Sequence, residues 1–170
     1  MEIRQATEAD YDGIYMLVEA AFKVAEMPPE NEQEFVLNLR KRDSFIPELE
    51  LVAEDDGELV GHVMLTKQEV KMSRGECRGL LLAPLCVSPE YRNKGIGAEL
   101  TYAVIEKARE LGYTAVFLVG YPKYYQKLGF REVGELGIEN KTGIPDEFVM
   151  GREIVEEGLA DVEGLVEKME

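Results

Sequence analysis

Apolar side chains recur along the chain at the spacings of strands and of helices. The run 80–87 reads LLLAPLCV, and such a continuous apolar run indicates a strand that is buried on both faces. Ser88 and Pro89 end the run, and apolar side chains then return at helical spacing over 96–111, before Gly112. The pattern therefore predicts a buried strand that leads through a turn into a long helix.

The same spacings predict the other elements. Helices are expected from a capping box at 7–10 to about 25, at 30–42 on the surface, at 121–128 and at 160–169. Strands are expected at 2–6, 50–54, 59–67 with a continuation towards Met72, 115–119, 130–133 and 148–155. Asp55, Asp56 and Gly57 predict a hairpin turn, and Ile46 and Pro47 a linker. Hairpins in the first half and a β-α-β unit in the centre predict an α+β fold with one mixed sheet.

The turn before the long helix combines two glycines with two cations. Its residues are Arg92, Asn93, Lys94, Gly95, Ile96 and Gly97. The first turn of a helix presents N–H groups that lack an intrahelical partner, together with the positive end of the helix dipole. Because glycine has no Cβ, a large anion can approach this backbone. The stretch predicts a cradle for a pyrophosphate, with a plain tight turn as the alternative.

Two other phosphate-binding motifs fit poorly. A dinucleotide fingerprint needs a third glycine where the chain has Leu100. The sequence Gly-x-x-x-x-Gly-Lys-Ser/Thr of a P-loop does not occur.

In these residues the chain resembles the GNAT superfamily of N-acetyltransferases. The family signature Arg/Gln-x-x-Gly-x-Gly/Ala follows a strand and opens a helix, and here it reads RNKGIG at 92–97. A second family segment, aromatic-Tyr-x-Lys-x-Gly-Phe, reads YYQKLGF at 124–130. The strand PLCV at 84–87 and the link VGYP at 119–122 are most similar to the YhbS-like branch. The resemblance covers about 3–154, which leaves 155–170 as an extension of a single domain over 1–170.

The resemblance implies a mostly antiparallel central sheet flanked by helices, whose strands at 80–87 and 115–119 splay apart. The gap would admit the pantetheine arm of acetyl-CoA, and the backbone of Leu85 and Val87, on either side of Cys86, would pair with the pantetheine amides. Pro84 predicts a bulge in this strand, with an edge strand as the alternative. Many members carry an Asn before the second helix, and here 119–122 has none, so Tyr121 or backbone groups would substitute.

The resemblance also implies that Tyr125 is the general acid. Amine attack on a thioester expels a thiolate, and a phenol with a pKa near ~10 can protonate that thiolate when it is held close to the sulfur. Tyr124 is adjacent, and the sequence leaves open which of the two faces the sulfur. Packing of both rings in the core is the other interpretation.

Other residues offer alternative chemistry. Cys86 lies beside the cradle and could form an acetyl-enzyme, but no histidine neighbours it in the sequence, so direct attack is favoured. His62 could take a proton from the incoming ammonium, although a structural role is preferred. Glu26, Glu30 and Glu54 are further possible bases.

Composition limits the partners. A net charge of −15 disfavours nucleic acid and would attract a cationic amine, although acidity also serves solubility alone. No apolar stretch approaches the ~18 residues of a membrane helix, and the N-terminus lacks a signal-peptide pattern. Two cysteines and one histidine favour neither a disulfide scaffold nor a zinc site, so a cytoplasmic protein without a metal is expected.

The expected function is therefore transfer of the acetyl group of acetyl-CoA to a primary amine, by direct attack in a ternary complex. The acceptor could be a small molecule or a protein, chosen by the helices within 11–42 and the loops at 134–147. The alternatives are an acyl-CoA sensor without turnover and an interaction domain without a cofactor. A longer acyl donor and a homodimer, which is common in the resembled family, stay open.

Overall fold

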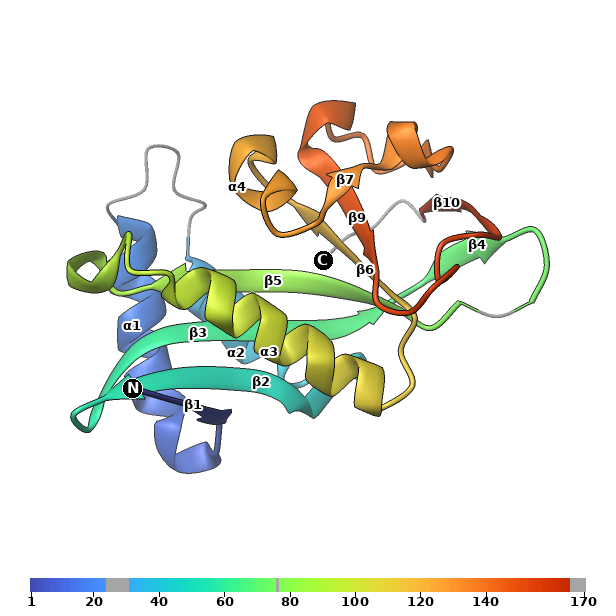
Figure 1. Cartoon of the computed structure of the whole chain (residues 1–170). Coiled ribbons are helices and arrows are strands. Elements are labelled where there is room, and N and C mark those ends of the chain that lie inside the picture. The colour runs from blue at the N-terminus through green and yellow to red at the C-terminus, as the bar shows by residue number, and fades with distance from the viewer. Residues whose placement is uncertain (24–30, 76, 166–170) are drawn as a thin grey trace. The chain divides into compact units, whose positions relative to one another are not determined.

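The computed structural model describes residues 1–23, 31–75 and 77–165 (Figure 1). These residues divide into two compact units. Unit one is Met1–Thr66 with Ala83–Val104, and unit two is Lys67–Leu82 with Ile105–Glu170. The division passes within β5 and within α3, so each of these elements contributes to both units.

Unit one is built on a sheet in the order β1-β2-β3-β5. Its elements are β1 (Glu2–Gln5), α1 (Tyr11–Lys23), α2 (Glu32–Leu39), β2 (Phe45–Asp55), β3 (Glu58–Gln68) up to Thr66, the end of β5 (Gly79–Val87) and the start of α3 (Ile96–Glu110). β1 pairs antiparallel with β2, and β2 antiparallel with β3. Asp56 and Gly57 have φ angles of 49° and 79°, so both central residues of the hairpin are left-handed, as a type I′ turn requires.

The sheet of unit one buries a different set of side chains on each face. On one face, buried residues of α1 and α2 form a cluster with residues of the strands: Ala6, Ile14, Leu17, Val18, Ala21, Val36, Leu39, Val52, Met64 and Cys86. On the other face, a Cβ at Gly61 would lie 2.7 Å from Leu100 and 3.2 Å from Ile96, so α3 packs closely there. Because side chains alternate along a strand, His62 faces the α1 and α2 side.

Unit two contains neighbouring strands in the order β5-β6-β9-β7 and a second sheet in the order β4-β10-β8. Its elements are β4 (Val70–Met72), the start of β5, the end of α3, β6 (Ala115–Val119), α4 (Pro122–Gln126), β7 (Arg131–Glu132), β8 (Glu139–Asn140), β9 (Val149–Glu153) and β10 (Val162–Leu165). The parallel register joins Gly79 to Ala115, Leu80 to Val116 and Leu81 to Phe117. Beyond these pairs the predicted splaying of β5 from β6 stays a prediction.

The predicted fold class is confirmed, and several elements agree closely with their predicted bounds. β6 has the predicted bounds, and Gly112 and Gly129 end α3 and the α4 turn with φ angles of 90° and 88°. The capping box also forms, since the Thr7 amide donates to Asp10 Oδ2 at 2.8 Å. β5 has hydrogen-bonded neighbours on both sides, so the edge-strand alternative for Pro84 is wrong.

Two predictions for α2 and the segment that follows it are wrong. Ile46 and Pro47 are not a linker, because β2 already begins at Phe45. The helix 30–42 shortens to α2, of which Val36 and Leu39 are buried, so α2 is more than a surface helix. The charged side chains of α2 suggest an exposed helix, but one stripe of apolar residues is enough for a helix to pack against a sheet. The predicted end of the first helix near residue 25 lies outside the described residues.

Two predictions around the small sheet of unit two are also wrong. The third strand does not simply continue to Met72, since β4 is a separate strand. The terminal helix at 160–169 is instead β10, as far as its residues are described. β10 pairs antiparallel with β4 and parallel with β8, with Val162 opposite Met72 and Gly164 opposite Glu139. Pairing on both sides satisfies the backbone of this segment better than a short terminal helix would.

Candidate functional site

The turn at the start of α3 is open on its outer side. Asn93 and Gly95 have φ angles of 61° and 82°, and the Glu99 amide donates to the Gly95 carbonyl at 3.0 Å as the first bond of the helix. A Cβ placed at Gly95 would meet no heavy atom within 4 Å. The first N–H groups of a helix need partners from outside the helix. The turn can therefore offer backbone donors and a positive dipole end to an anion.

The two cations of this turn behave differently. Lys94 is exposed, and its Nζ lies 4.9 Å from the centroid of the Tyr91 ring. Arg92 instead donates from Nη2 to the Ala21 carbonyl at 2.8 Å, near the end of α1. The guanidinium thus satisfies a carbonyl of the last helical turn, where cations are favourable. An anion on this turn would meet mainly the backbone amides and Lys94.

The end of β5 leads directly into this turn. Leu85 and Val87 are partly exposed and alternate with buried Cys86, as expected for a strand. The Ser88 amide donates to the Val60 carbonyl at 2.8 Å, which ties the end of β5 to the start of β3. The structure of unit one thus places 85–87 and 92–97, all predicted cofactor residues, on one strand-turn-helix segment.

Cys86 is poorly suited to act as a nucleophile. Its side chain is 6% exposed, and burial raises the pKa of its thiol to about 12, with a further upward contribution from Glu32 and a downward one from Arg92. A thiol with this pKa is almost entirely protonated near neutral pH, whereas the thiolate is the nucleophilic form.

A buried ionic network crosses unit one between α2 and the sheet. The carboxylate of Glu50 accepts hydrogen bonds from Arg40 Nη2 at 2.5 Å and from His62 Nε2 at 2.9 Å. Glu50 and His62 are 1% and 0% exposed, and the Arg40 guanidinium lies 3.7 Å from the centroid of the Tyr11 ring. Burial raises the pKa of Glu50, but the hydrogen bonds and charges of His62 and Arg40 outweigh it, so the net pKa is lowered.

The network limits the roles open to His62. Since Glu50 accepts from Nε2, the other ring nitrogen, Nδ1, is buried and has no hydrogen-bond partner within the described part of the chain. A side chain that is fully buried cannot touch an acceptor amine, so His62 fits the structural role that the sequence favoured. Neither Arg40 nor Glu50 was predicted, and only the presence of an acidic residue in an apolar strand could have pointed to Glu50.

Of the other candidate bases, one is occupied. Arg4 donates to Glu54 Oε2 from Nη2 at 2.7 Å and also binds both oxygens of Asp10. This charge pairing holds the pKa of Asp10 well below its usual range. Glu54 is thus committed to a structural ion pair, while Glu26 and Glu30 lie outside the described residues.

Tyr125 lies in unit two, where the end of β6 passes into α4. Its ring packs edge-on against Tyr124 and Phe130, with centroid distances of 4.9 and 5.8 Å. Its carbonyl accepts from the amides of Leu128 and Phe130, at 3.0 and 3.1 Å. Burial and then the nearby Tyr124 raise the pKa of the Tyr125 hydroxyl far above its ordinary value.

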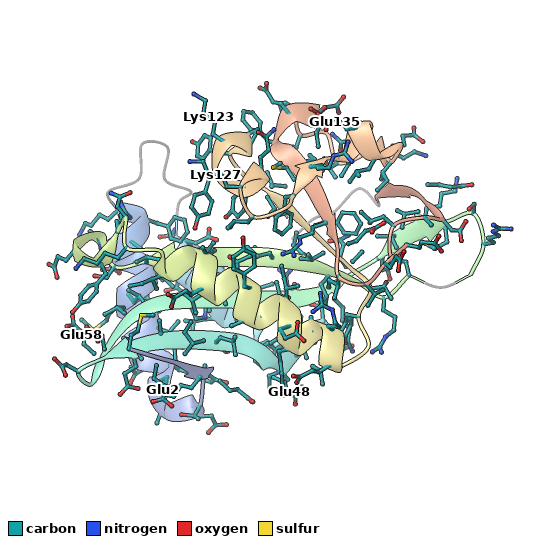
Figure 2. The ribbon with its side chains drawn as sticks, in the orientation of Figure 1. Glu2, Glu48, Glu58, Lys123, Lys127 and Glu135 are labelled. Atoms are coloured by element: carbon teal, nitrogen blue, oxygen red, sulfur yellow. The ribbon has the colours of Figure 1, made fainter. Side chains whose placement is uncertain are left out.

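Because Gly120 has no side chain, the Tyr125 ring can pack directly against its backbone. A Cβ at Gly120 would lie 2.5 and 3.0 Å from two carbons of this ring, and the shorter distance is one that real Cβ atoms essentially never show. Tyr124 is more exposed, and burial raises its pKa as well. Figure 2 shows Lys123 within α4 and Lys127 directly after it, so two cations flank the two tyrosines in the sequence of this segment.

Two large side chains just before α4 are exposed to solvent. Val119 and Tyr121 are 42% and 55% exposed, and Tyr121 packs edge-on against Phe148 at 6.3 Å. Tyr121, named above as a substitute for the missing Asn, thus presents its side chain at the end of β6.

Neither a metal site nor a membrane helix is found in the described part of the chain. No group of three or more His, Cys, Asp or Glu side chains there could hold a metal ion. None of the described helices is both long and apolar enough to span a membrane.

Comparison with known proteins adds a family match. The model of the acetyltransferase (GNAT) domain family matches residues 2–133. YhbS of Escherichia coli strain K12, an uncharacterized N-acetyltransferase, is 31% identical over 169 residues, which are 98% of this chain and 95% of that protein. YjhQ of the same strain is 35% identical over 117 residues, which are 68% of this chain but only 65% of YjhQ.

Solved structures agree with the sequence comparison. YhbS from Escherichia coli, in complex with CoA, superposes with a TM-score of 0.82 at 28% identity, over 96% of this chain and 87% of that one. A GNAT family acetyltransferase from Brucella melitensis, in complex with acetyl-CoA, gives 0.68 at 30% identity, over 76% and 82%. The likeness extends across the mixed sheet and its helices.

Proposed function

The chain belongs to the GNAT family of acetyltransferases, and on that premise we propose that it transfers the acetyl group of acetyl-CoA to a primary amine of a small molecule or a protein. The observation that carries the proposal is the open turn at 92–97 between β5 and α3. In this proposal the turn holds the pyrophosphate of the cofactor. Related proteins bound to CoA or acetyl-CoA support the choice of cofactor.

In the proposed reaction the amine attacks the thioester directly. The backbone of Leu85 and Val87 pairs with the amides of the pantetheine arm, and a nearby N–H polarises the thioester carbonyl. The C–S bond breaks as the C–N bond forms, and Tyr125 gives its hydroxyl proton to the departing thiolate. The protonated, buried thiol of Cys86 supports direct attack over an acetyl-cysteine intermediate.

A panel of amines tests the activity. The full chain is mixed with acetyl-CoA and, one at a time, with polyamines, amino acids and a peptide with a free N-terminus, and free thiol is measured. We expect thiol release that depends on at least one amine. Saturable binding of CoA with no amine-dependent release would instead indicate a sensor. Absence of any stabilisation by CoA would contradict both, since a bound ligand raises stability by a few kcal/mol when it is about 100-fold above its Kd.

Gly120→Ala should disturb catalysis without touching the cofactor turn. The new Cβ would displace the Tyr125 ring, because it would lie 2.5 Å from a ring carbon. Since misplacing a catalytic group by about 1 Å can cost 10²-fold, we expect kcat to fall at least tenfold with little change in the Kd for CoA. The matched control is Gly134→Ala, whose Cβ would lie an ordinary 3.5 Å from Glu132 Oε1. An unchanged kcat for Gly120→Ala would show that the position of the ring is unimportant.

A further inference from the structure

The ammonium of Lys94 lies on an aromatic ring and not on a carboxylate. Its Nζ is 4.9 Å from the centroid of the Tyr91 ring, within the distance at which a cation and an aromatic face attract each other. Lys94 is exposed, and it makes no ion pair within the described part of the chain. This choice of partner is unexpected in a chain with 34 acidic side chains and only 19 lysines and arginines.

Carboxylates are nevertheless close to the hydroxyl end of the Tyr91 ring. Partial burial, and after it the charges of four carboxylates, raise the pKa of the Tyr91 hydroxyl. These carboxylates belong to Asp55, Glu58 (labelled in Figure 2), Asp56 and Glu90. An ion pair with one of them would neutralise the charge of Lys94, whereas a neutral ring attracts the ammonium and leaves its charge intact.

The backbone explains why the ring and the ammonium meet. Tyr91 ends the short 3-10 turn Pro89–Tyr91, in which its amide donates to the Ser88 carbonyl at 2.9 Å. Two residues later Asn93 has a φ angle of 61°, so the chain turns back sharply before Lys94. The backbone of Tyr91 is thus held next to the end of β5, and the left-handed residue brings the lysine side chain back to the ring.

Of the two cations in this turn, Lys94 has the charge that is more available to an anion. Arg92 is already engaged, since its Nη2 donates to the Ala21 carbonyl. The backbone amides of the turn can bind a phosphate group, and an ammonium that is not neutralised adds a charge-assisted contact. What holds Lys94 in place therefore affects how well the turn binds an anion.

We propose that Tyr91 is a positioning residue for the cofactor. Its ring holds the Lys94 ammonium at the turn 92–97 and leaves the positive charge available to the pyrophosphate. This inference rests on the proposed function, and it concerns residues of unit one alone. It assigns no contact with the cofactor to Tyr91 itself, so any effect of the ring must pass through Lys94.

A double-mutant cycle on CoA binding tests the proposal. Tyr91→Leu removes the ring, and we expect the Kd of the full chain for CoA to rise about threefold, as for loss of an exposed cation–π contact. Lys94→Gln removes the charge and should raise the Kd about tenfold. In the Lys94→Gln background, Tyr91→Leu should have no further effect, because the ring then has no ammonium to hold. Isothermal titration calorimetry at low salt measures each Kd.

Tyr91→Phe is the matched control, since it removes the hydroxyl but keeps the ring, and it should bind CoA like the wild type. Added salt should weaken binding to the wild type more than binding to Lys94→Gln, which lacks the exposed charge that salt screens. Three results would overturn the proposal: a wild-type Kd for Tyr91→Leu, an equal loss in both backgrounds, or a Tyr91→Phe variant as weak as Tyr91→Leu. If the wild type itself does not bind CoA, the proposed function fails together with this inference, which is a different result from a wild type that binds and a ring that does not matter.

Discussion

Tyr125→Phe is expected to lower kcat about 100-fold, while the KM for acetyl-CoA changes little. The ring packing against Tyr124 and Phe130 can persist in the variant, so only the proton donor is lost. Because burial keeps the pKa of Tyr125 above its ordinary value, the wild-type hydroxyl holds its proton through the whole neutral range. The kcat of the wild type should therefore show no loss from deprotonation of this group below pH ~10. Steady-state kinetics with free-thiol detection measure both effects.

Two further variants make the Tyr125 experiment decisive. Tyr113→Phe is the control, because Tyr113 is buried and its ring, which lies 4.3 Å from the Arg78 guanidinium carbon, keeps that contact as Phe. Tyr124→Phe tests the neighbouring hydroxyl, and we expect a smaller effect on kcat than for Tyr125→Phe. Near-normal turnover in Tyr125→Phe would remove Tyr125 from the reaction.

Arg40→Ala is expected to lower the free energy of unfolding by about 3–5 kcal/mol, because it leaves Glu50 buried and unpaired on one side. The cation–π contact with Tyr11 is lost as well. Denaturant unfolding measures the change. Lys41→Ala is the control at an exposed neighbouring position, where an effect within about 0.5 kcal/mol is expected.

The pH dependence of stability provides a second readout. Since the folded-state pKa of Glu50 is lowered, its contribution to stability is present above the unfolded pKa of about 4.5 and is lost as pH falls through the folded pKa. In Arg40→Ala the effect of burial should be opposed less and should raise the pKa of Glu50. The loss of stability at low pH should therefore be smaller than in the wild type. Glu50→Gln added to Arg40→Ala should recover part of the stability, because no uncompensated charge remains. An Arg40→Ala variant as stable as Lys41→Ala would contradict this account.

The sequence was most informative where structure is local. The turn at 92–97 combines its glycines, its cations and the start of α3 in consecutive residues, so its geometry could be predicted without knowledge of the rest of the fold. The hairpin at Asp56 and Gly57 and the capping box at Thr7 follow from the same kind of short-range chemistry.

The sequence was least informative where distant segments meet. Glu50 is separated by 10 residues from Arg40 and by 12 from His62, and the register of β2 and β3 shifts between Phe45 and Glu50. The residue of β3 that meets Glu50 depends on that register. The spacing of Val162 and Leu165 is that of a helix, and it led to a wrong prediction for β10. The partner strands β4 and β8, which decide its conformation, lie elsewhere in the chain.

Glu32 shows why burial is hard to predict from the local sequence. In the sequence it is one of several glutamates in a charged helix, and nothing local distinguishes it from Glu34. The two glutamates differ only in the folded chain, where Val36 and Leu39 pack one face of α2 against the sheet. Glu32 is then partly buried, whereas Glu34 is exposed.

Amide NMR during a titration with CoA tests the central claim most directly, namely that the backbone at the start of α3 holds the pyrophosphate. The account predicts that the amide signals of Gly95, Ile96 and Gly97 shift most, followed by those of Leu85 and Val87, and that all saturate with one Kd. Saturable binding that leaves the amides of 95–97 unchanged while others move would contradict it.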